Sequence, residues 1–191
     1  INMIAASFPF LSTQTANLHR FWWDGTPLGQ QICPNNPLQH VVQAIAQAIQ
    51  RYDHPHSCLA MIIQKNEHNV FDQRGIEFEL LQKFEIPTLR LTLEEIAERA
   101  SLQNGHLKIG ESVLALTYFR AAYSPEELKS DQAMQGRQLI EASSSIKVPD
   151  IGSHLSGMKK IQQVLTDRKQ LAQFVPDAVA ERLLPCFVGI Y

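Results

Sequence analysis

The sequence predicts an α/β protein whose mostly parallel sheet is flanked by helices. Two continuous apolar runs, CLAMII (58–63) and VLALTYF (113–119), have the length of strands buried on both faces. Segments with a helical apolar period alternate with these runs, and such alternation favours parallel strands joined by crossover helices. A chain of 191 residues is long enough for one sizeable domain or for a large domain with a small appendage.

The first half of the chain contains two predicted helices and a strand between them. The opening INMIAASF reads as a strand, and Asn35-Asn36-Pro37 is a helix start signal. After that signal the apolar residues follow a helical period as far as Tyr52, which predicts an amphipathic helix. CLAMII is the next strand, and the apolar spacing over 76–84 predicts a second helix.

The second half begins with shorter elements. TLRLTL (88–93) alternates like a strand, and TLEEIAERA is a short helix with acidic residues in its first turn. The turn signals Asn104-Gly105 and Ile109-Gly110 predict a small hairpin before VLALTYF. From Pro125 onward the chain is predicted to be mainly helical, with an interruption at SSSIKVPD.

Composition excludes several classes of protein. The 17 Lys and Arg residues nearly balance 19 Asp and Glu residues, so no nucleic-acid partner is expected. No apolar stretch approaches the roughly 20 residues that cross a bilayer, and the N-terminus lacks signal-peptide features, so we expect no membrane association and a cytoplasmic location. Three widely spaced cysteines without a CxxC pair predict buried, inert thiols rather than a zinc site or a disulfide framework.

Polar residues follow three of the predicted strands, and ligands of open α/β sheets bind beyond the carboxyl ends of strands. If the strands are parallel and adjacent, these residues converge on one edge of the sheet. The candidates are Ala5, Ala6 and Ser7 after the first strand, Glu67, His68 and Asn69 after CLAMII, and Arg120 and Tyr123 after VLALTYF.

The chemistry of these candidates suits an amino acid. The guanidinium of Arg120 matches a carboxylate, Tyr123 adds a rigid hydroxyl, and Glu67 with Asn69 and Gln73 suits an ammonium group. The alternative is that Arg120 forms a structural ion pair with Glu67 or Asp72. The spacing leaves both interpretations open.

Other motifs are weaker. His54 and His56 form an HxH in a Pro-containing turn with no matching ligand cluster, which is typical of a solvated loop. Neither a dinucleotide fingerprint nor a P-loop is present. Lys159-Lys160 is typical of a solvated helix face, and Trp22 with Trp23 is expected to pack against other side chains.

Several segments together resemble eukaryotic-type glutathione synthetase, an ATP-grasp ligase. NVFDQRGIEFELL, LTYFRAAYSP and IKVPDIGSHLSGMKKIQQVL are similar to the family's NIFDQRAIE, VYFRxGYxP and KxPDIxxQLxGxKKxQQ. INMIAASF and CPNNPLQH are similar to its INTISASF and SNNP segments, in the family's order along the whole chain. The resemblance implies a Rossmann-like substrate-binding domain with a helical C-terminal segment.

The resemblance also implies an activity. The family joins γ-glutamylcysteine to glycine: ATP phosphorylates the cysteinyl carboxylate, the glycine amine attacks the acyl phosphate, and Mg²⁺ bridges the nucleotide phosphates. The resemblance implies a homodimer for the full-length protein, with dimer contacts largely outside this segment. Relatives that use β-alanine leave the second amino acid open.

Individual residues match the family's motifs. Asn2 corresponds to a Mg²⁺ ligand and Lys159 to a lysine that reaches the ATP phosphates. Ser7 and the backbone from Ile4 onward correspond to a strand end that contacts the peptide substrate. The remaining substrate contacts implied by the resemblance are Glu67, Asn69, Gln73, Arg120 and Tyr123.

Two departures and an incomplete site limit what the chain is expected to do. Ala5 and Ala122 replace a serine and a glycine common in the family, and the lost serine hydroxyl removes one hydrogen bond, worth about 1 kcal/mol. The family's other metal, glycine and nucleotide groups fall outside these residues, so the chain alone is expected to bind substrate without turnover.

The expected organisation has three parts: 1–56 as strand and helices of the ATP-grasp body, 57–157 as the substrate-binding domain, and 158–191 as a helical segment. Besides a ligase fragment, a non-catalytic glutathione-synthetase-like binding module remains an alternative. An unrelated Rossmann-like binding protein for an amino acid or dipeptide explains Arg120 and Glu67 but not the PDIGSHLSGMKK block.

Overall fold

The computed structural model describes residues 7–187, so the predicted strand in the opening INMIAASF lies outside the described residues. The described chain forms two compact units, one ending at Val148 and the other beginning at Pro149. The first unit contains the sheet, and the second consists of short helices. The boundaries predicted at 56/57 and 157/158 remain predictions.

One mixed sheet organises the first unit. Its strands are β1 (Ser57–Ile62), β2 (Thr88–Leu91), β3 (Ser101–Gln103), β4 (His106–Ile109), β5 (Ser112–Phe119) and β6 (Ile146–Val148). Along the order β2-β1-β5-β4-β3 the first three strands are parallel, and β6 also runs parallel to β5. The antiparallel pairs are β5-β4 and β4-β3. The predicted mostly parallel α/β sheet, with the two apolar runs as its centre, is therefore confirmed.

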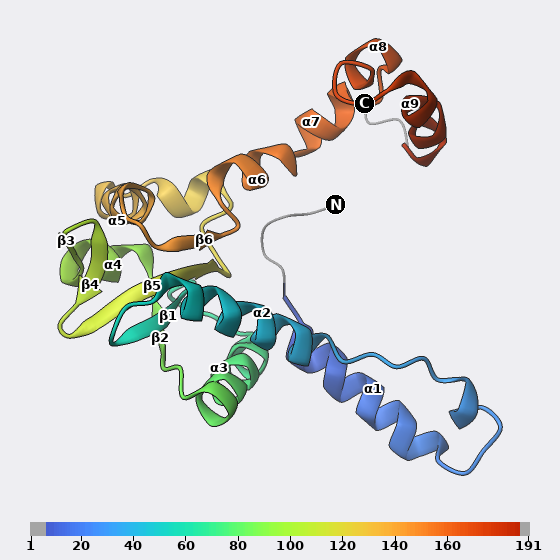
Figure 1. Cartoon of the computed structure of the whole chain (residues 1–191), viewed down its shortest axis with the longest axis horizontal. Helices are drawn as coiled ribbons and strands as arrows, with labels where there is room; N and C mark the ends of the chain where they lie inside the picture. Colours follow the sequence, from blue (N-terminus) through green and yellow to red (C-terminus); the bar gives the residue numbers. More distant parts are fainter. Residues whose placement is uncertain (1–6, 188–191) are drawn as a thin grey trace. The chain divides into compact units, whose positions relative to one another are not determined.

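Helices cover both faces of this sheet (Figure 1). Those of the first unit are α1 (Pro9–Trp23), η1 (Gly29–Gln31), α2 (Pro37–Tyr52), α3 (Val70–Phe84), α4 (Leu93–Arg99), η2 (Pro125–Leu128) and α5 (Asp131–Ala142). The helices α2 and α3 lie on one face, and α4 with α5 lies on the other. Asn36 caps α2 through its side chain, so the predicted start signal is confirmed.

Two local predictions need adjustment. The run TLRLTL ends as a strand at Leu91, because Thr92 and Glu95 form a capping box that starts α4. The interruption SSSIKVPD contains strand β6, whose three residues pair with the end of β5. The hairpin at Asn104-Gly105 is confirmed, and both residues adopt the positive φ that such a turn requires.

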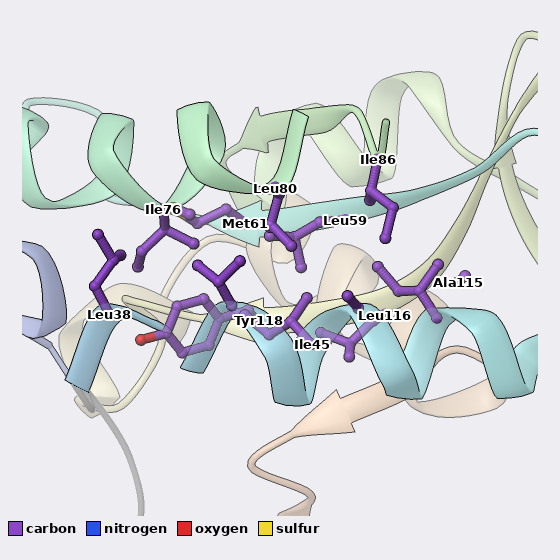
Figure 2. Close-up of a cluster of buried hydrophobic side chains, with 13 residues drawn as sticks. Leu38, Ile45, Leu59, Met61, Ile76, Leu80, Ile86, Ala115, Leu116 and Tyr118 are labelled. Atoms are coloured by element: carbon purple, nitrogen blue, oxygen red, sulfur yellow. The ribbon is translucent and has the colours of Figure 1, made fainter. Parts of the chain in front are cut away.

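The main core lies between β1, β5 and the helices α2 and α3 (Figure 2). The side chains of Leu59 and Met61 from β1 meet Leu116 and Tyr118 from β5, and all four are at most 4% exposed. Ile45 packs on them from α2. Because both central strands are covered on both faces, their sequences read as continuous apolar runs.

Helix α1 is fixed at its first residues and exposed at its last. Trp22 is 71% exposed and Trp23 is 41% exposed, so the expectation that they pack is wrong for the described chain. Although η1 lies against the last residue of α1, it leaves both tryptophan side chains exposed. The cysteine prediction holds only for Cys58, since Cys33 and Cys186 are exposed.

The second unit contains only short helices in its described part. They are α6 (Ile151–Ser156), α7 (Lys159–Val164), α8 (Arg168–Leu171), α9 (Asp177–Leu183) and η3 (Leu184–Cys186). The prediction that the chain is mainly helical after Pro125 is thereby confirmed for this unit. Among residues 7–187 no helix has both the length and the apolarity needed to cross a membrane.

Candidate functional site

The carboxyl ends of β1, β2 and β5 meet at one edge of the sheet. Ile62 pairs with Leu91 on one side and with Phe119 on the other. The backbone of Arg120, just past β5, donates to the carbonyl of Ile62 over 2.9 Å. The loops after the two apolar strands therefore converge, as the sequence predicts.

A buried ion pair lies at this edge. Nη1 of Arg120 is 2.7 Å from Oδ2 of Asp72, and the two side chains are 3% and 0% exposed. Asp72 also accepts backbone hydrogen bonds from Phe8 at 2.9 Å, Phe10 at 2.9 Å and Leu11 at 3.1 Å. These N–H groups at the start of α1 have no partner within their own helix, and the helix dipole favours an anion there. Asp72 thus joins α1, α3 and the end of β5.

Of the two interpretations left open for Arg120, the structure shows the ion pair, and the partner is Asp72. Glu67 is engaged elsewhere: its Oε1 accepts from the backbone N–H of Asn69 over 2.8 Å. Arg120 also forms a hydrogen bond with the side chain of Tyr118. Burial raises the pKa of the Tyr118 hydroxyl, and the interaction with Arg120 only partly offsets this rise. A guanidinium has five N–H donors, which is more than Asp72 and Tyr118 use. The Asp72–Arg120 ion pair therefore leaves donors of Arg120 for a ligand.

Gln73 carries a buried donor without a partner. Its side chain is fully buried, its Oε1 accepts from Nε of Arg90 over 3.0 Å, and among residues 7–187 its Nε2 has no hydrogen-bond partner. Because Nε of arginine can only donate, this bond assigns the amide oxygen to the Arg90 side and the NH₂ group away from it. An unpaired buried donor costs about 1–3 kcal/mol, which a ligand acceptor would recover.

Arg90 itself is half-buried on β2. Burial lowers its pKa, the nearby charge of Arg74 lowers it further, and Glu77 and Glu67 raise it. The charge of Glu67, a predicted site residue, therefore acts on Arg90. Arg90 was not predicted as a site residue, because the alternation of TLRLTL shows only that it belongs to a strand.

Two cavities flank these residues. One, of about 540 Å³, is lined mainly by apolar side chains of α2, with Ser7 and Tyr118 among its walls. The other, of about 130 Å³, lies at the carboxyl edge between Gln64 and Ala122 and includes Glu127. Ser7 therefore lines the same cavity as Tyr118, which is itself hydrogen-bonded to Arg120.

The remaining predicted residues differ in placement. Tyr123 is 43% exposed, His68 is exposed and Asn69 is half-buried at the start of α3. Lys159 is exposed in the second unit, with its Nζ 3.2 Å from Oε1 of Gln162. The predicted residues Asn2, Ile4, Ala5 and Ala6 lie outside the described residues.

A third acidic residue, Glu127, escaped prediction although the sequence carries a signal for it. Ser124-Pro125-Glu126-Glu127 has the S-x-x-E spacing of a capping box with proline at the first helical position, and the structure contains that box. Glu127 closes the loop that carries Tyr123. No comparable sequence pattern predicts that Asp72 caps α1, whose first residues lie 61 to 64 positions away in the sequence.

Fold and site together define an α/β domain with charged and amide groups at the carboxyl edge of parallel strands. A family model described as eukaryotic glutathione synthase matches residues 57–156. The chain belongs to the eukaryotic glutathione synthase family, which confirms the resemblance seen in its motifs.

Curated relatives and a solved structure agree with this assignment. The chain is 38% identical over 198 residues to the glutathione synthetase of Homo sapiens, covering 100% of this chain and 41% of that protein. It is 34% identical to the chloroplastic glutathione synthetase of Solanum lycopersicum, covering 100% and 36%. A glutathione synthetase-like effector of Globodera pallida shares the fold with a TM-score of 0.76 at 20% identity, over 95% of this chain and 42% of that one. The chain thus spans about two fifths of the length of these relatives.

Proposed function

We propose that this chain supplies the γ-glutamylcysteine-binding part of a glutathione synthetase, a ligase that uses ATP to join γ-glutamylcysteine to glycine through an acyl phosphate. Membership of the glutathione synthase family and relatives named glutathione synthetase support glutathione synthesis as the general function. Because the chain spans about two fifths of those relatives, the complete reaction belongs to the proposal.

The observation that carries the proposal is the unpaired, fully buried Nε2 of Gln73. A buried N–H₂ group at the carboxyl edge of a parallel sheet calls for a hydrogen-bond acceptor from a ligand. Arg120 supplies further donors at the same edge of the sheet, just past the end of β5. A peptide carrying an α-carboxylate provides acceptors for both groups.

The proposed division of roles follows charge. Arg120 binds the γ-glutamyl α-carboxylate, Tyr123 adds its hydroxyl, and Glu67 with Asn69 faces the ammonium group. Gln73 donates to a ligand oxygen. The backbone and side chains of Ile4, Ala5, Ala6, Ser7 and His68 complete the substrate contacts.

The groups for ATP and Mg²⁺ are less complete in the described part of the chain. Lys159 is exposed and could reach a phosphate, but residues 7–187 contain no group of three His, Cys, Asp or Glu side chains able to hold a metal ion. The proposed Mg²⁺ ligand Asn2 lies outside that range. We propose that the chain alone binds substrate without turnover.

Other features of the proposal concern the whole protein. The parts 1–56, 57–157 and 158–191 are proposed to serve as ATP-grasp body, substrate-binding domain and helical segment. The full-length protein is proposed to be a homodimer. A cytoplasmic location is proposed as well, although two relatives are named as chloroplastic.

Calorimetric titration of γ-glutamylcysteine into the parent chain, Gln73→Met and Gln82→Met tests the binding step. Gln82 is an exposed glutamine of the same helix and serves as the matched control. We expect saturable heat in the parent and in Gln82→Met, and affinity at least about tenfold weaker in Gln73→Met, since one hydrogen bond to a charged group is worth about 1.5–3 kcal/mol. Equal affinity in all three chains would refute the assignment of Gln73.

Substitution of Gln73 is preferable to substitution of Arg120. Removing Arg120 leaves the Asp72 carboxylate buried without its counter-ion, so a loss of binding could reflect unfolding. Methionine at position 73 instead removes a donor that has no partner in the described chain. It also removes the hydrogen bond that Arg90 donates to Oε1 of Gln73, at the expense of some stability. Thermal unfolding without ligand measures that expense directly.

A non-catalytic binding module is the second candidate, and one observation favours it: the structural neighbour is named a glutathione synthetase-like effector. The two candidates differ in turnover. Phosphate release that depends on ATP, γ-glutamylcysteine and glycine, measured on a protein that contains the missing three fifths of the family's length, would support the ligase. Saturable binding without any release in that protein would support the module.

A further inference from the structure

The carboxylate of Glu127 accepts hydrogen bonds from two different loops of the candidate site. Its Oε1 accepts from the backbone N–H of Ala122 over 3.0 Å and from Nε2 of Gln64 over 3.3 Å. Its Oε2 accepts from the backbone N–H groups of Tyr123 over 3.2 Å and Ser124 over 3.1 Å, and from the Ser124 hydroxyl over 3.2 Å. One carboxylate thus receives three successive backbone N–H groups.

The backbone conformation of this loop depends on that carboxylate. Successive N–H groups converge on one anion where the chain adopts a turn or a combination of right-handed and left-handed conformations. Ala122 has a φ of 67°, in the left-handed region that is unfavourable for a residue with a Cβ. Five hydrogen bonds to the Glu127 carboxylate offset this unfavourable conformation, since charge-assisted hydrogen bonds are stronger than neutral ones.

The protonation state of Glu127 supports this role. Burial raises the pKa of its carboxyl group, but the hydrogen bonds from Ala122, Ser124 and Tyr123 outweigh burial and lower the pKa overall. The group is therefore an anion at neutral pH. Its neighbour Glu126 is exposed, with Lys129 at 3.9 Å as its ion-pair partner.

We propose that Glu127 is a positioning residue of the candidate site: it holds the loop that carries Tyr123 in its left-handed turn and ties that loop, through Gln64, to the loop that leads to Glu67 and Asn69. This inference rests on the proposed function, because Tyr123, Glu67 and Asn69 are the residues assigned to the substrate. Glu127 itself makes no contact with substrate in this account.

Glutamine at position 127 is an informative replacement. It keeps the length of the side chain, but only one of its two terminal atoms is an acceptor. The amide NH₂ therefore faces N–H or O–H donors whichever way the group is turned. Glu127→Gln thus loses either the Ala122 and Gln64 contacts or the Tyr123 and Ser124 contacts, and the contacts that remain are weakened because the acceptor no longer carries a charge.

Amide hydrogen exchange of the ligand-free chain, followed by NMR, measures the two loops directly. In Glu127→Gln we expect exchange at Tyr123 and Ser124 to speed up about tenfold or more, as the loss of a charge-assisted hydrogen bond requires. Exchange should also speed up at Asn69, whose N–H donates to Glu67 in the other loop. Glu126→Gln, the matched control, should exchange like the parent.

A second variant separates backbone conformation from general destabilisation. Ala122→Gly removes the Cβ that opposes the left-handed φ, so it should slow exchange at Tyr123 in the Glu127→Gln background. Glycine in an ordinary loop position would have the opposite effect, because it enlarges the unfolded ensemble. Slower exchange in the double variant therefore identifies the turn as the feature that Glu127 maintains.

The affinity for γ-glutamylcysteine, measured by calorimetry on the same variants, provides the functional readout. We expect about tenfold weaker binding in Glu127→Gln, partial recovery on adding Ala122→Gly, and parental binding in Glu126→Gln. Unchanged exchange at Tyr123 and Asn69 in Glu127→Gln would overturn the inference, as would faster exchange with parental affinity. No saturable heat in the parent would instead refute the proposed function for this chain, and exchange at Asn69 alone would then decide whether Glu127 ties the two loops.

Discussion

Gly75 makes a close contact that should respond sharply to a single methyl group. A Cβ built on this residue of α3 would lie 2.2 Å from Cγ and Cδ2 of Phe10 and 2.7 Å from its Cβ. Carbon atoms prefer about 3.5–4.0 Å, so the ring of Phe10 fills the space that alanine would need. The family motif NIFDQRAIE carries alanine where this chain has Gly75.

Gly75→Ala should therefore destabilise the chain. Overpacking typically costs about 1–3 kcal/mol, and alanine recovers about 0.5–1 kcal/mol over glycine inside a helix. The net loss is about 1–2 kcal/mol, or roughly 3–6 °C in melting temperature for a domain of this size. Denaturation followed by circular dichroism measures it.

A double-mutant cycle with Phe10→Gly, which removes the Cβ as well as the ring, isolates the contact. Without the ring, Gly75→Ala should stabilise by about 0.5–1 kcal/mol, because only the helix preference remains. The sign of the effect thus reverses between the two backgrounds, with a coupling energy equal to the overpacking cost of about 1–3 kcal/mol. Equal effects of Gly75→Ala in both backgrounds would show that Phe10 does not occupy this space.

Four further substitutions and conditions give clear expectations. Asp72→Ala should cost about 3–5 kcal/mol in chemical denaturation, because it leaves a buried guanidinium without its counter-ion; a loss below about 1 kcal/mol would contradict that account. Gly136→Ala should prevent α5 from docking on α4, since the added Cβ would lie 2.0 Å from the Leu93 carbonyl oxygen, and a parental melting curve would be the contrary result. Burial raises the pKa of Cys58 to about 12, so a thiol reagent at pH 8 should modify two thiols in the native chain and three after unfolding; three native thiols would contradict its burial. The pKa of Glu127 is lowered in the folded chain, so the stabilisation from its carboxylate is present above the ordinary carboxyl pKa and is lost as the pH falls through the folded pKa. The difference in stability between the parent and Glu127→Gln should therefore shrink below about pH 4. A difference that stays constant with pH would contradict this account.

The sequence predicted the sheet well because its central strands are buried on both faces. Such strands read as unbroken apolar runs, and CLAMII and VLALTYF became β1 and β5. Helix α2 was predictable from a local start signal and an apolar period. β6 was missed because three residues in a serine-rich break gain their strand conformation only by pairing with β5.

Convergence of the candidate residues could also be predicted, but their pairing could not. The rule for strand ends brought Arg120 and the loop after β1 to one edge. The choice of Asp72 over Glu67 as the partner of Arg120 depends on the rotation of α3, which places Asp72 under α1 and leaves Glu67 bonded to its own loop. No local pattern encodes that rotation.

Asp72 also has a consequence for the order of folding. Its bonds to α1 close loops of 61 to 64 residues, and its bond to Arg120 spans 48. Each closure carries an entropic cost that grows with loop length, and the carboxylate can lose its hydration only once Arg120 is beside it. Pairing of β1 with β5 brings Arg120 to that position, so the first helix of the chain should be among the last to dock. During synthesis α1 then stays undocked, with its aromatic end in water, until about 100 further residues have emerged from the ribosome.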